Sequence, residues 1–282
     1  MIPKLDLRKW IRKIPEHSEP LPLESTTPIE HYRRGANDAY NLLQYFDRLA
    51  TGKSVYAGPR QRHRSRLAAL TLVALIESFE RFLKELAAVC VDNVASITLD
   101  DRLAVLSVNS RSVAAHFDEE TLGKALCEGN IWLDTASTTT RFGKLLASHF
   151  QNVSFQFFPA SSKDPEHWRG DTMDLLFQLR HSIVHNVGVI TRSDALKLRL
   201  MCQRAVSAPR VLTPSNGDVW YAKLFLDETA RWANDRVADR LATVLTERHA
   251  DDATLFEPSE KATGLARLFR KTMTVAGETA SP

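Results

Sequence analysis

The stretch that decides the fold is RHSIVHNVG, residues 180–188, at the end of a segment with helical periodicity. Apolar side chains recur at spacings of three and four over residues 171–186, which predicts a helix with one buried face. That face holds Met173, Leu176, Phe177, Ile183, Val184 and Val187. Arg180 projects into the middle of it. Because a guanidinium stays charged, it must meet a carboxylate, water, a polar partner surface or an anionic ligand.

The same helix has a polar face. At about 100° per residue, one strip of this face holds Asp174, Gln178, His181 and His185. His185 is expected in the last turn, where the negative end of the helix dipole favours an imidazolium. Asn186 and Gly188 are expected to stop the helix, because both tolerate the left-handed cap. The sequence thus places an anion-binding cation and an acid/base group close together at one helix end.

Plainer interpretations of this stretch stay open. Many helices carry an arginine that snorkels out of an apolar face, and many end in a histidine that only satisfies the dipole. His181 and His185 are also four residues apart, as paired metal ligands on a helix are. However, Ser182 stands where the zinc motif HExxH requires glutamate, and no nearby cysteine completes a ligand set. We therefore expect neither a metal nor another cofactor.

Arg180 and His185, with four residues between them, resemble the Rx4-6H signature of the HEPN superfamily, and residues 183–188 continue in a similar style. Residues 70–83, LTLVALIESFERFL, resemble the long early helix of that fold, with Glu77 inside an apolar run. The resemblance covers roughly residues 62–250, in the style of HEPN domains related to the RiboL-PSP group. His181 departs from the commoner Asn or Asp at its position, so its orienting role does not carry over directly.

The resemblance implies a metal-independent endoribonuclease, in which a ribose 2′-OH attacks the neighbouring phosphorus and leaves a 2′,3′-cyclic phosphate and a 5′-OH. His185 would be the general acid/base, and Arg180 would stabilise the charge on the phosphorane oxygens. His181, Asn186 and Glu77 would support them. One histidine cannot easily serve both sides of a phosphate, so the resemblance also implies a homodimer in which two motifs share one cleft. Such proteins commonly act in toxin–antitoxin or antiphage defence, with an antitoxin or defence-system protein as partner.

Glu77 has two interpretations. It is either a buried partner that holds the guanidinium of Arg180, or an exposed carboxylate that pairs with Arg81 one turn later. A second cationic feature is RQRHRSR, residues 60–66, whose positive charge is unfavourable at the start of a helix. RNA phosphates would offset that cost. The predicted RNA-binding side chains are Arg60, Arg62, Arg64 and Arg66, with residues 32–34 as a candidate extension. The alternative is a solvated loop that keeps the protein soluble.

The composition limits the classes of protein to which this chain can belong. The chain has 282 residues, 44% of them hydrophobic and 25% charged, and a formal net charge of +3, as in an ordinary globular protein. The three cysteines, Cys90, Cys127 and Cys202, form no CxxC pair, which favours a reducing cytoplasm. The first residues lack the apolar core of a signal peptide, and the longest apolar run is too short to span a bilayer. We therefore expect a cytoplasmic protein without membrane contact.

The pattern along the chain predicts an all-α fold, a HEPN-like helical bundle with an N-terminal helical extension and irregular insertions. The expected regions are 1–60 (arm and helix), 61–250 (HEPN-like domain) and 251–282 (a loosely held tail). Helices are expected over 28–49, 65–94, 141–152, 171–186, 193–208 and 218–249, with short helices in 98–128. Loops are expected over 129–140 and 153–168, a breaker at Gly58-Pro59 and a turn at Asn216-Gly217.

A second function remains open at this point. The same helices would also suit a non-catalytic HEPN-like module that binds RNA, a nucleotide or a partner protein, with Arg180 used only as an anchor. The tryptophans give no separate signal for nucleic acid, because packing in the core is the plainer role for most of Trp132, Trp168, Trp220 and Trp232. The two functions differ in one respect: only the catalytic protein cuts RNA, and only it depends on His185 for that.

Overall fold

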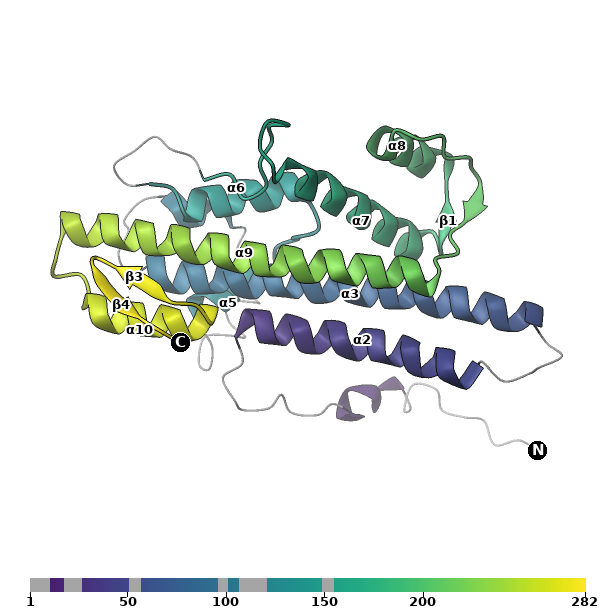
Figure 1. Ribbon diagram of the computed structural model, residues 1–282, viewed down its shortest axis with the longest axis horizontal. Coiled ribbons are helices and arrows are strands. Elements are labelled where there is room, and N and C mark those ends of the chain that lie inside the picture. The colour runs from purple at the N-terminus through teal and green to yellow at the C-terminus, as the bar shows by residue number, and fades with distance from the viewer. Residues whose placement is uncertain (1–10, 18–26, 51–56, 96–100, 107–120, 149–154) are drawn as a thin grey trace.

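The computed structural model describes residues 11–17, 27–50, 57–95, 101–106, 121–148 and 155–282, and for residues 17, 50, 57–61 and 101 it describes the backbone alone. Of the described residues, 71% are helical and 4% are in strands, so the predicted all-α class is confirmed. Three long helices lie side by side and form the body of the molecule (Figure 1). They are α2 (Pro28–Ala50), α3 (Ala57–Val94) and α9 (Asn216–Asp251). In the described part of the chain, no helix is both long and apolar enough to cross a bilayer.

Local sequence explains where these helices begin. Thr27 and Glu30 exchange hydrogen bonds ahead of α2, since the Thr27 backbone N–H donates to the Glu30 carboxylate and the Glu30 N–H donates to the Thr27 hydroxyl. Ser215 and Asp218 form the same kind of capping box at the start of α9. The predicted turn at residues 216–217 is therefore wrong, because both residues lie in the first turn of α9. Helix α3 likewise begins before the predicted breaker, because a proline in the first turn needs no N–H partner.

One continuous hydrophobic core joins the long helices. Phe79 and Phe82 of α3 contact the ring of Tyr32 on α2, and Leu241 of α9 is fully buried in the same core. Helices α5 (Leu122–Glu128), α6 (Thr135–Leu145) and α7 (His167–His185) cover one side of this body. The expected loop over 129–140 is wrong in its second half, because the Asp134 carboxylate caps the first turn of α6. Helix α6 ends at Leu145, short of the predicted residue 152.

The C-terminal segment is part of the core, and the prediction of a loosely held tail is wrong. Helix α10 (Pro258–Phe269) is followed by a hairpin of β3 (Met273–Val275) and β4 (Glu278–Ala280), and both pack near the end of α9 (Figure 1). Leu265, Phe269 and Val275 are buried. Ala262, Leu265, Ala266 and Phe269 recur at helical spacing, so this segment has its own apolar face. Buried residues from all three predicted regions share one core.

Beside the end of α7, a small unit stands apart from the bundle (Figure 1). It consists of β1 (Val189–Ile190), α8 (Arg192–Cys202) and β2 (Arg210–Val211), and the two strands pair antiparallel. Its own small core contains Ile190, Ala195 and Leu198. Helix α8 ends earlier than predicted, because Gln203 turns the chain into the left-handed conformation. Two 3₁₀ turns, Ile14–His17 and Asp101–Val105, complete the described elements.

Candidate active site

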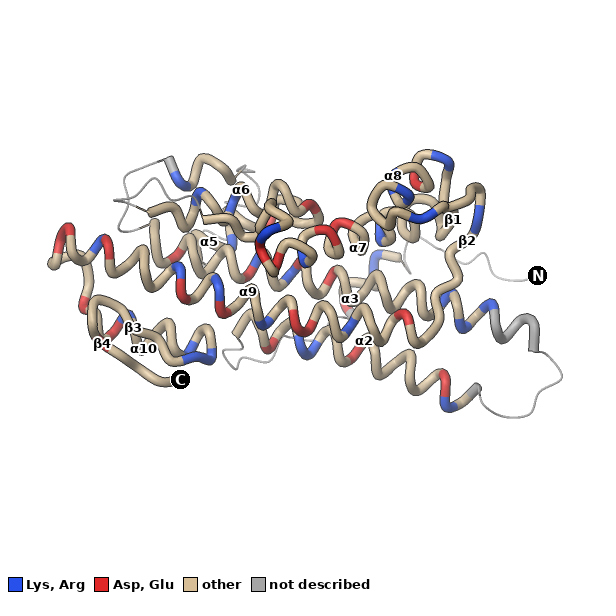
Figure 2. The backbone as a smooth tube through the Cα atoms, turned by 45° about the horizontal axis from the view of Figure 1, so that its top comes forward, with Lys and Arg blue, Asp and Glu red and all other residues tan. Residues whose placement is uncertain are grey.

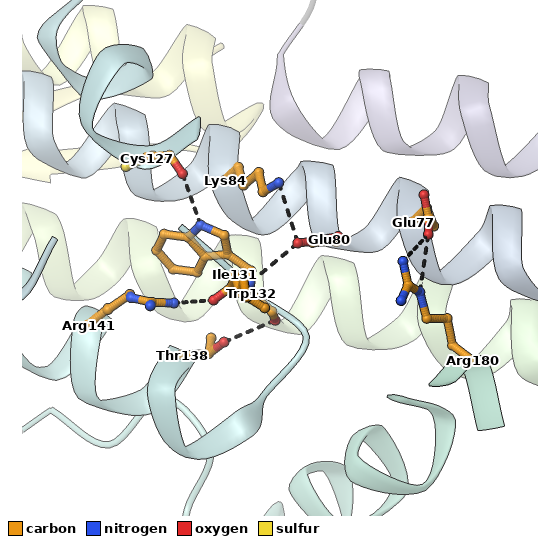
Figure 3. A network of polar contacts seen from close by, with 9 residues as sticks. All are labelled: Glu77, Glu80, Lys84, Cys127, Ile131, Trp132, Thr138, Arg141 and Arg180. Atoms are coloured by element: carbon orange, nitrogen blue, oxygen red, sulfur yellow. Dashed lines mark hydrogen bonds and ion pairs between the residues drawn. The ribbon is translucent and has the colours of Figure 1, made fainter. Parts of the chain in front are cut away.

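Arg180 and Glu77 form an ion pair between α7 and α3 (Figure 3). The Nε and Nη2 atoms of Arg180 both donate to Glu77 Oε1, at 3.1 and 2.6 Å. The Arg180 side chain is 21% exposed and that of Glu77 is 47% exposed. Each of the two interpretations of Glu77 is therefore right in part: it is the partner of Arg180, and its carboxylate is exposed rather than buried. Arg81, the alternative partner, binds Glu85 instead.

Among the partners expected for the charge of Arg180, the structure shows a carboxylate of the same chain. Arg180 does lie beside buried apolar residues of α7, namely Met173, Leu176, Phe177 and Ile183. However, its charge is met within a single chain, so accommodating the guanidinium does not require a second copy. Val184 and Val187, predicted on the buried face, are exposed instead. Val184 lies in the last turn of α7, and Val187 lies two residues beyond its end.

His181 and His185 lie on the outer side of α7, and both side chains are exposed. Their rings are neighbours, with centroids 4.7 Å apart and planes inclined by 41°. Within the described residues neither ring makes a hydrogen bond, so both are open to solvent and to a ligand. His185 lies in the last turn of α7, as the sequence predicts, and the helix ends at this residue rather than at the predicted residue 186. Five residues correspond to roughly 140° around a helix, so His185 and Arg180 leave α7 in different directions.

Asp194 organises the end of α7, and the sequence analysis did not single it out. This buried carboxylate accepts hydrogen bonds from Gln178 Nε2 at 3.0 Å and from Asn186 Nδ2 at 2.8 Å. It also accepts from the Thr191 backbone N–H and hydroxyl, in a capping box that starts α8. Burial raises the pKa of Asp194, but the hydrogen bonds from Thr191 and Asn186 outweigh it and lower that pKa. The Thr-x-x-Asp spacing was a sequence signal that could have revealed this cap.

Asn186 therefore supports the helix end in a different way from the one predicted. Its backbone is not left-handed, and its side chain links α7 to Asp194. The left-handed residues are Val187, with φ of 54°, and Gly188, with φ of 80°. The Gly188 N–H donates to the Ser182 carbonyl and closes the turn. A β-branched residue is strained in this conformation, so Val187 occupies a costly position at the edge of the site.

An open groove of about 490 Å³ lies between the start of α3 and the end of α7. Its walls come from Arg62, Ser65, Arg66, Ala69 and Leu70 of α3, from Ile183, Val187 and Gly188, and from residues 211–213. Arg62 and Arg66 are exposed, and in the described part of the chain neither forms an ion pair. The structure thus brings two of the predicted RNA-binding arginines beside the motif helix.

The other predicted cationic residues are placed differently. Arg64 forms an ion pair with Asp47 of α2, which reduces its availability to a ligand. The side chain of Arg60 lies outside the described residues. Residues 32–34 do not extend this surface, because His31 contacts Glu85, far along α3 from Arg62, and the Tyr32 ring is buried. The hydroxyl of Tyr32 donates to Asp227 of α9.

The unit that follows α7 adds positive charge at the same end of the molecule. Residues 189–215 carry five basic side chains, Arg192, Lys197, Arg199, Arg204 and Arg210, and all five are exposed. The single carboxylate in this segment, Asp194, is buried. Figure 2 shows these basic positions around α8 and β2, near the blue positions at the start of α3. The sequence analysis missed this run, although its charge exceeds the net +3 of the whole chain.

At its other end α7 is anchored by a buried arginine that the sequence analysis also missed. Arg169 is 5% exposed and donates to Glu166, to the Thr229 hydroxyl at 3.2 Å and to Glu228 at 2.8 Å. Its guanidinium lies over the rings of Trp168 and Trp232, at 4.7 and 5.4 Å from their centroids. This cluster joins α7 to α9.

A corner around Trp132 holds α6 against α3 (Figure 3). The indole is buried and donates to the Cys127 carbonyl at 3.2 Å, and the Trp132 carbonyl accepts from the Thr138 hydroxyl. Arg141 stacks over this ring, 5.0 Å from its centroid. The predicted core role is confirmed for Trp132 and for Trp232, which packs against the core. Trp168 and Trp220 do not share it, because they are 44% and 41% exposed.

The described residues give little support for metal-dependent or thiol-based chemistry. No group of three His, Cys, Asp or Glu side chains there is arranged to hold a metal ion. All three cysteines carry free thiols. Burial raises the pKa of the Cys127 thiol to about 12 and that of Cys90 well above its usual range. Neither buried thiol is therefore a reactive thiolate near neutral pH.

Comparisons with protein-family models, with curated proteins and with solved structures find no match to this chain. The site is therefore interpreted from its own geometry. That geometry combines two exposed imidazoles, one partly exposed arginine–glutamate pair and a groove lined by two exposed arginines at the basic end of the molecule. Imidazoles can move protons near neutral pH, and guanidinium groups bind phosphates.

Proposed function

We propose that this protein is a metal-independent endoribonuclease of the HEPN type. The observation that carries the proposal is the exposed His185 at the end of α7, two residues before Val187, which lines a groove together with Arg62 and Arg66. Arginines without carboxylate partners favour a polyanion, and an imidazole at the helix end can transfer a proton to or from it. The five exposed cations of residues 189–215 extend the surface available to phosphates.

In the proposed reaction His185 takes the proton from a ribose 2′-OH. The oxygen then attacks the adjacent phosphorus, and the bond to the 5′ oxygen breaks, which leaves a 2′,3′-cyclic phosphate and a 5′-OH. The leaving oxygen needs a proton from the opposite side. Arg180 stabilises the charge that develops on the phosphorane oxygens. Because one His185 cannot serve both sides of the phosphate, we propose that a two-fold dimer supplies the second proton donor. A dimer would also allow Arg180 and His185 of different chains, which leave α7 in different directions, to meet at one phosphate.

A second candidate is a non-catalytic module that binds RNA. The observation in its favour is the Glu77–Arg180 ion pair, which occupies the guanidinium within one chain. In such a module Arg180 would only join α7 to α3, and the basic end of the molecule would hold RNA without cutting it. The two candidates share the binding surface and differ in their dependence on His185.

The test is to incubate the purified protein with total RNA in the presence of EDTA and to map the new ends. Cleavage that persists in EDTA and leaves 2′,3′-cyclic phosphates supports the enzyme. His185→Ala is expected to lower the rate about a hundredfold or more, and Arg180→Lys to impair it strongly, because an ammonium lacks the bidentate fork. Loss of cleavage in EDTA with rescue by zinc contradicts the metal-free mechanism.

A matched control is His249→Ala, because His249 lies in the last turn of α9 as His185 does in α7. Cleavage by this variant should equal that of the unchanged protein. If neither the protein nor its variants cut RNA but all bind it, the binding module is the right function. For the dimer, mixing His185→Ala chains with unchanged chains should alter activity in proportion to heterodimer content. Full activity of a species that light scattering shows to be monomeric rules the dimer out.

A further inference from the structure

The face of α3 that borders the groove continues to the Glu77–Arg180 pair. Arg62, Arg66, Leu70 and Glu77 are spaced by four, four and seven residues, so they share one side of the helix. At 1.5 Å per residue, Arg62 and Glu77 are separated by about 22 Å along the axis of α3. One side of this helix therefore carries two exposed guanidinium groups at its start and a carboxylate that holds a third guanidinium further on.

The facing side of α7 runs alongside in the opposite direction. Arg180 and Ile183 are three residues apart and share one side of α7, and Val187 follows two residues after the helix ends. Arg180 contacts Glu77, while Ile183 and Val187 line the groove with the earlier residues of α3. The two helices lie antiparallel in Figure 1, which agrees with these contacts. Arginines thus flank both ends of one continuous face between α3 and α7.

The walls between these arginines are apolar and uncovered. Leu70 is 56% exposed, Val187 71% and Val211 64%, and all three line the groove. Exposed apolar walls between cations fit a ligand with charged and apolar parts in alternation. An unpaired nucleic-acid strand is such a ligand, because its phosphates alternate with bases whose faces are free. A duplex is not, because its bases are stacked inside and the A-form major groove is too narrow for side chains.

We infer that this face is the path of a single RNA strand. Arg62 and Arg66 bind phosphates at one end, Arg180 binds a phosphate at the other, and the apolar walls contact bases between them. Glu77 occupies Arg180 in the free protein and is displaced by the incoming phosphate. With 47% of its side chain exposed, Glu77 can swing into water without disturbing the core. The inference rests on the proposed function. It adds that the bound RNA is single-stranded and that the Glu77 carboxylate competes with the phosphate for Arg180.

The experiment measures binding of a fluorescent 2′-O-methyl oligouridine, which lacks the attacking hydroxyl and cannot be cut, by anisotropy at several salt concentrations. Replacing Arg62 and Arg66 by Ala together should weaken binding about tenfold and reduce the slope of log affinity against log salt by roughly 1.4, since each phosphate contact on a single strand contributes about 0.7. Glu77→Gln should strengthen binding by up to about fivefold, because it frees Arg180 from a weak surface pair.

Matched controls lie at the opposite end of the molecule, on α10. Arg267→Ala and Glu260→Gln change the charge by the same amount per site, and both residues are exposed. They should leave affinity and slope almost unchanged. A duplex of the same length bound as tightly as the single strand overturns the inference. An unchanged dependence of affinity on salt in the double arginine variant also overturns it. Weaker binding by Glu77→Gln overturns it too, because it would mean that the carboxylate only positions Arg180. Thermal unfolding of each variant checks that the fold is intact.

The results separate this inference from the proposed cleavage. Binding that depends on Arg62, Arg66 and Glu77 as described, in a protein that never cuts RNA, supports the strand path and contradicts the enzyme. Cleavage in EDTA that depends on His185, with binding indifferent to these three residues, supports the enzyme and contradicts the strand path.

Discussion

Arg169 and Arg180 lie on the same helix, about three turns apart, and their surroundings differ in burial and in partners. Arg169 is 5% exposed, donates to three side chains and lies over two tryptophan rings. Arg180 has a 21% exposed side chain and donates to one carboxylate, which is itself half exposed. A guanidinium bound on every side holds two helices together. One with a single exposed partner can exchange that partner for a ligand.

The largest effect on stability is expected from Arg169→Met. The change leaves the carboxylates of Glu166 and Glu228 without their shared cation and removes the contact with the two tryptophans. We expect a loss of about 3 kcal/mol in the free energy of unfolding, measured by urea denaturation followed by circular dichroism. Arg180→Met, the same replacement on the same helix, is the matched comparison. Equal losses for the two variants would break the distinction between them.

A smaller loss is expected from Asp194→Asn, which weakens the hydrogen bonds that tie Gln178, Asn186 and Thr191 to the end of α7. The cost at neutral pH should be about 2 kcal/mol. Asp171→Asn on α7 is the control, because that carboxylate is 70% exposed and pairs with His167 one turn earlier on the same helix. A cost no greater than that of the control would show that Asp194 does not organise this end of the helix.

The stability difference between the unchanged protein and Asp194→Asn should depend on pH. The pKa of Asp194 is lowered in the folded chain, because the hydrogen bonds to its carboxylate outweigh burial. The ionised carboxylate therefore stabilises the fold at pH values above the ordinary carboxyl pKa of about 3.9. This stabilisation is lost as the pH falls through the pKa that Asp194 has in the folded chain. The difference between the unchanged protein and Asp194→Asn should therefore be full at neutral pH and shrink below about pH 4. A difference that grows on acidification has the wrong sign.

The Arg180–Glu77 pair should contribute less. Each of Arg180→Met and Glu77→Gln is expected to cost below about 1 kcal/mol, and a double-mutant cycle should give a coupling of about 0.5 kcal/mol. The coupling should fall in high salt, because exposed pairs are screened. A coupling of about 3 kcal/mol would place Arg180 in the same structural class as Arg169 and remove the argument that it is available to a phosphate.

The smallest change is expected from Val187→Gly. Relief of the left-handed strain favours glycine by about 1 kcal/mol, but glycine also loses more chain entropy on folding. The net stabilisation should be near 0.5 kcal/mol, seen as a slightly higher melting temperature. Val184→Gly, inside the last turn of α7, should instead destabilise by about 1 kcal/mol. If both variants lose stability equally, the strain at Val187 is not relieved by glycine.

Local patterns in the sequence were sufficient for the all-α class, for most of the long helices and for the placement of Arg180 and His185 on one of them. These features depend on the spacing of residues over a few helical turns, which can be read from the sequence alone. The errors also have local causes. Capping side chains at Asp134 and Ser215 start helices where polar residues had indicated loops, and Pro59 fits inside a first turn.

Tertiary structure alone decided which groups meet. Glu77 has a cation at i+4 in the sequence, yet it binds Arg180, more than a hundred residues away, because α7 packs against that face of α3. The same packing brings Arg62 and Arg66 beside Val187 and the basic residues 189–215 beside both. Tertiary packing also decided that α10 and its hairpin belong to the core. Periodicity shows which side of a helix is buried, but the partner of that side depends on the packing of distant segments, which local spacing does not encode.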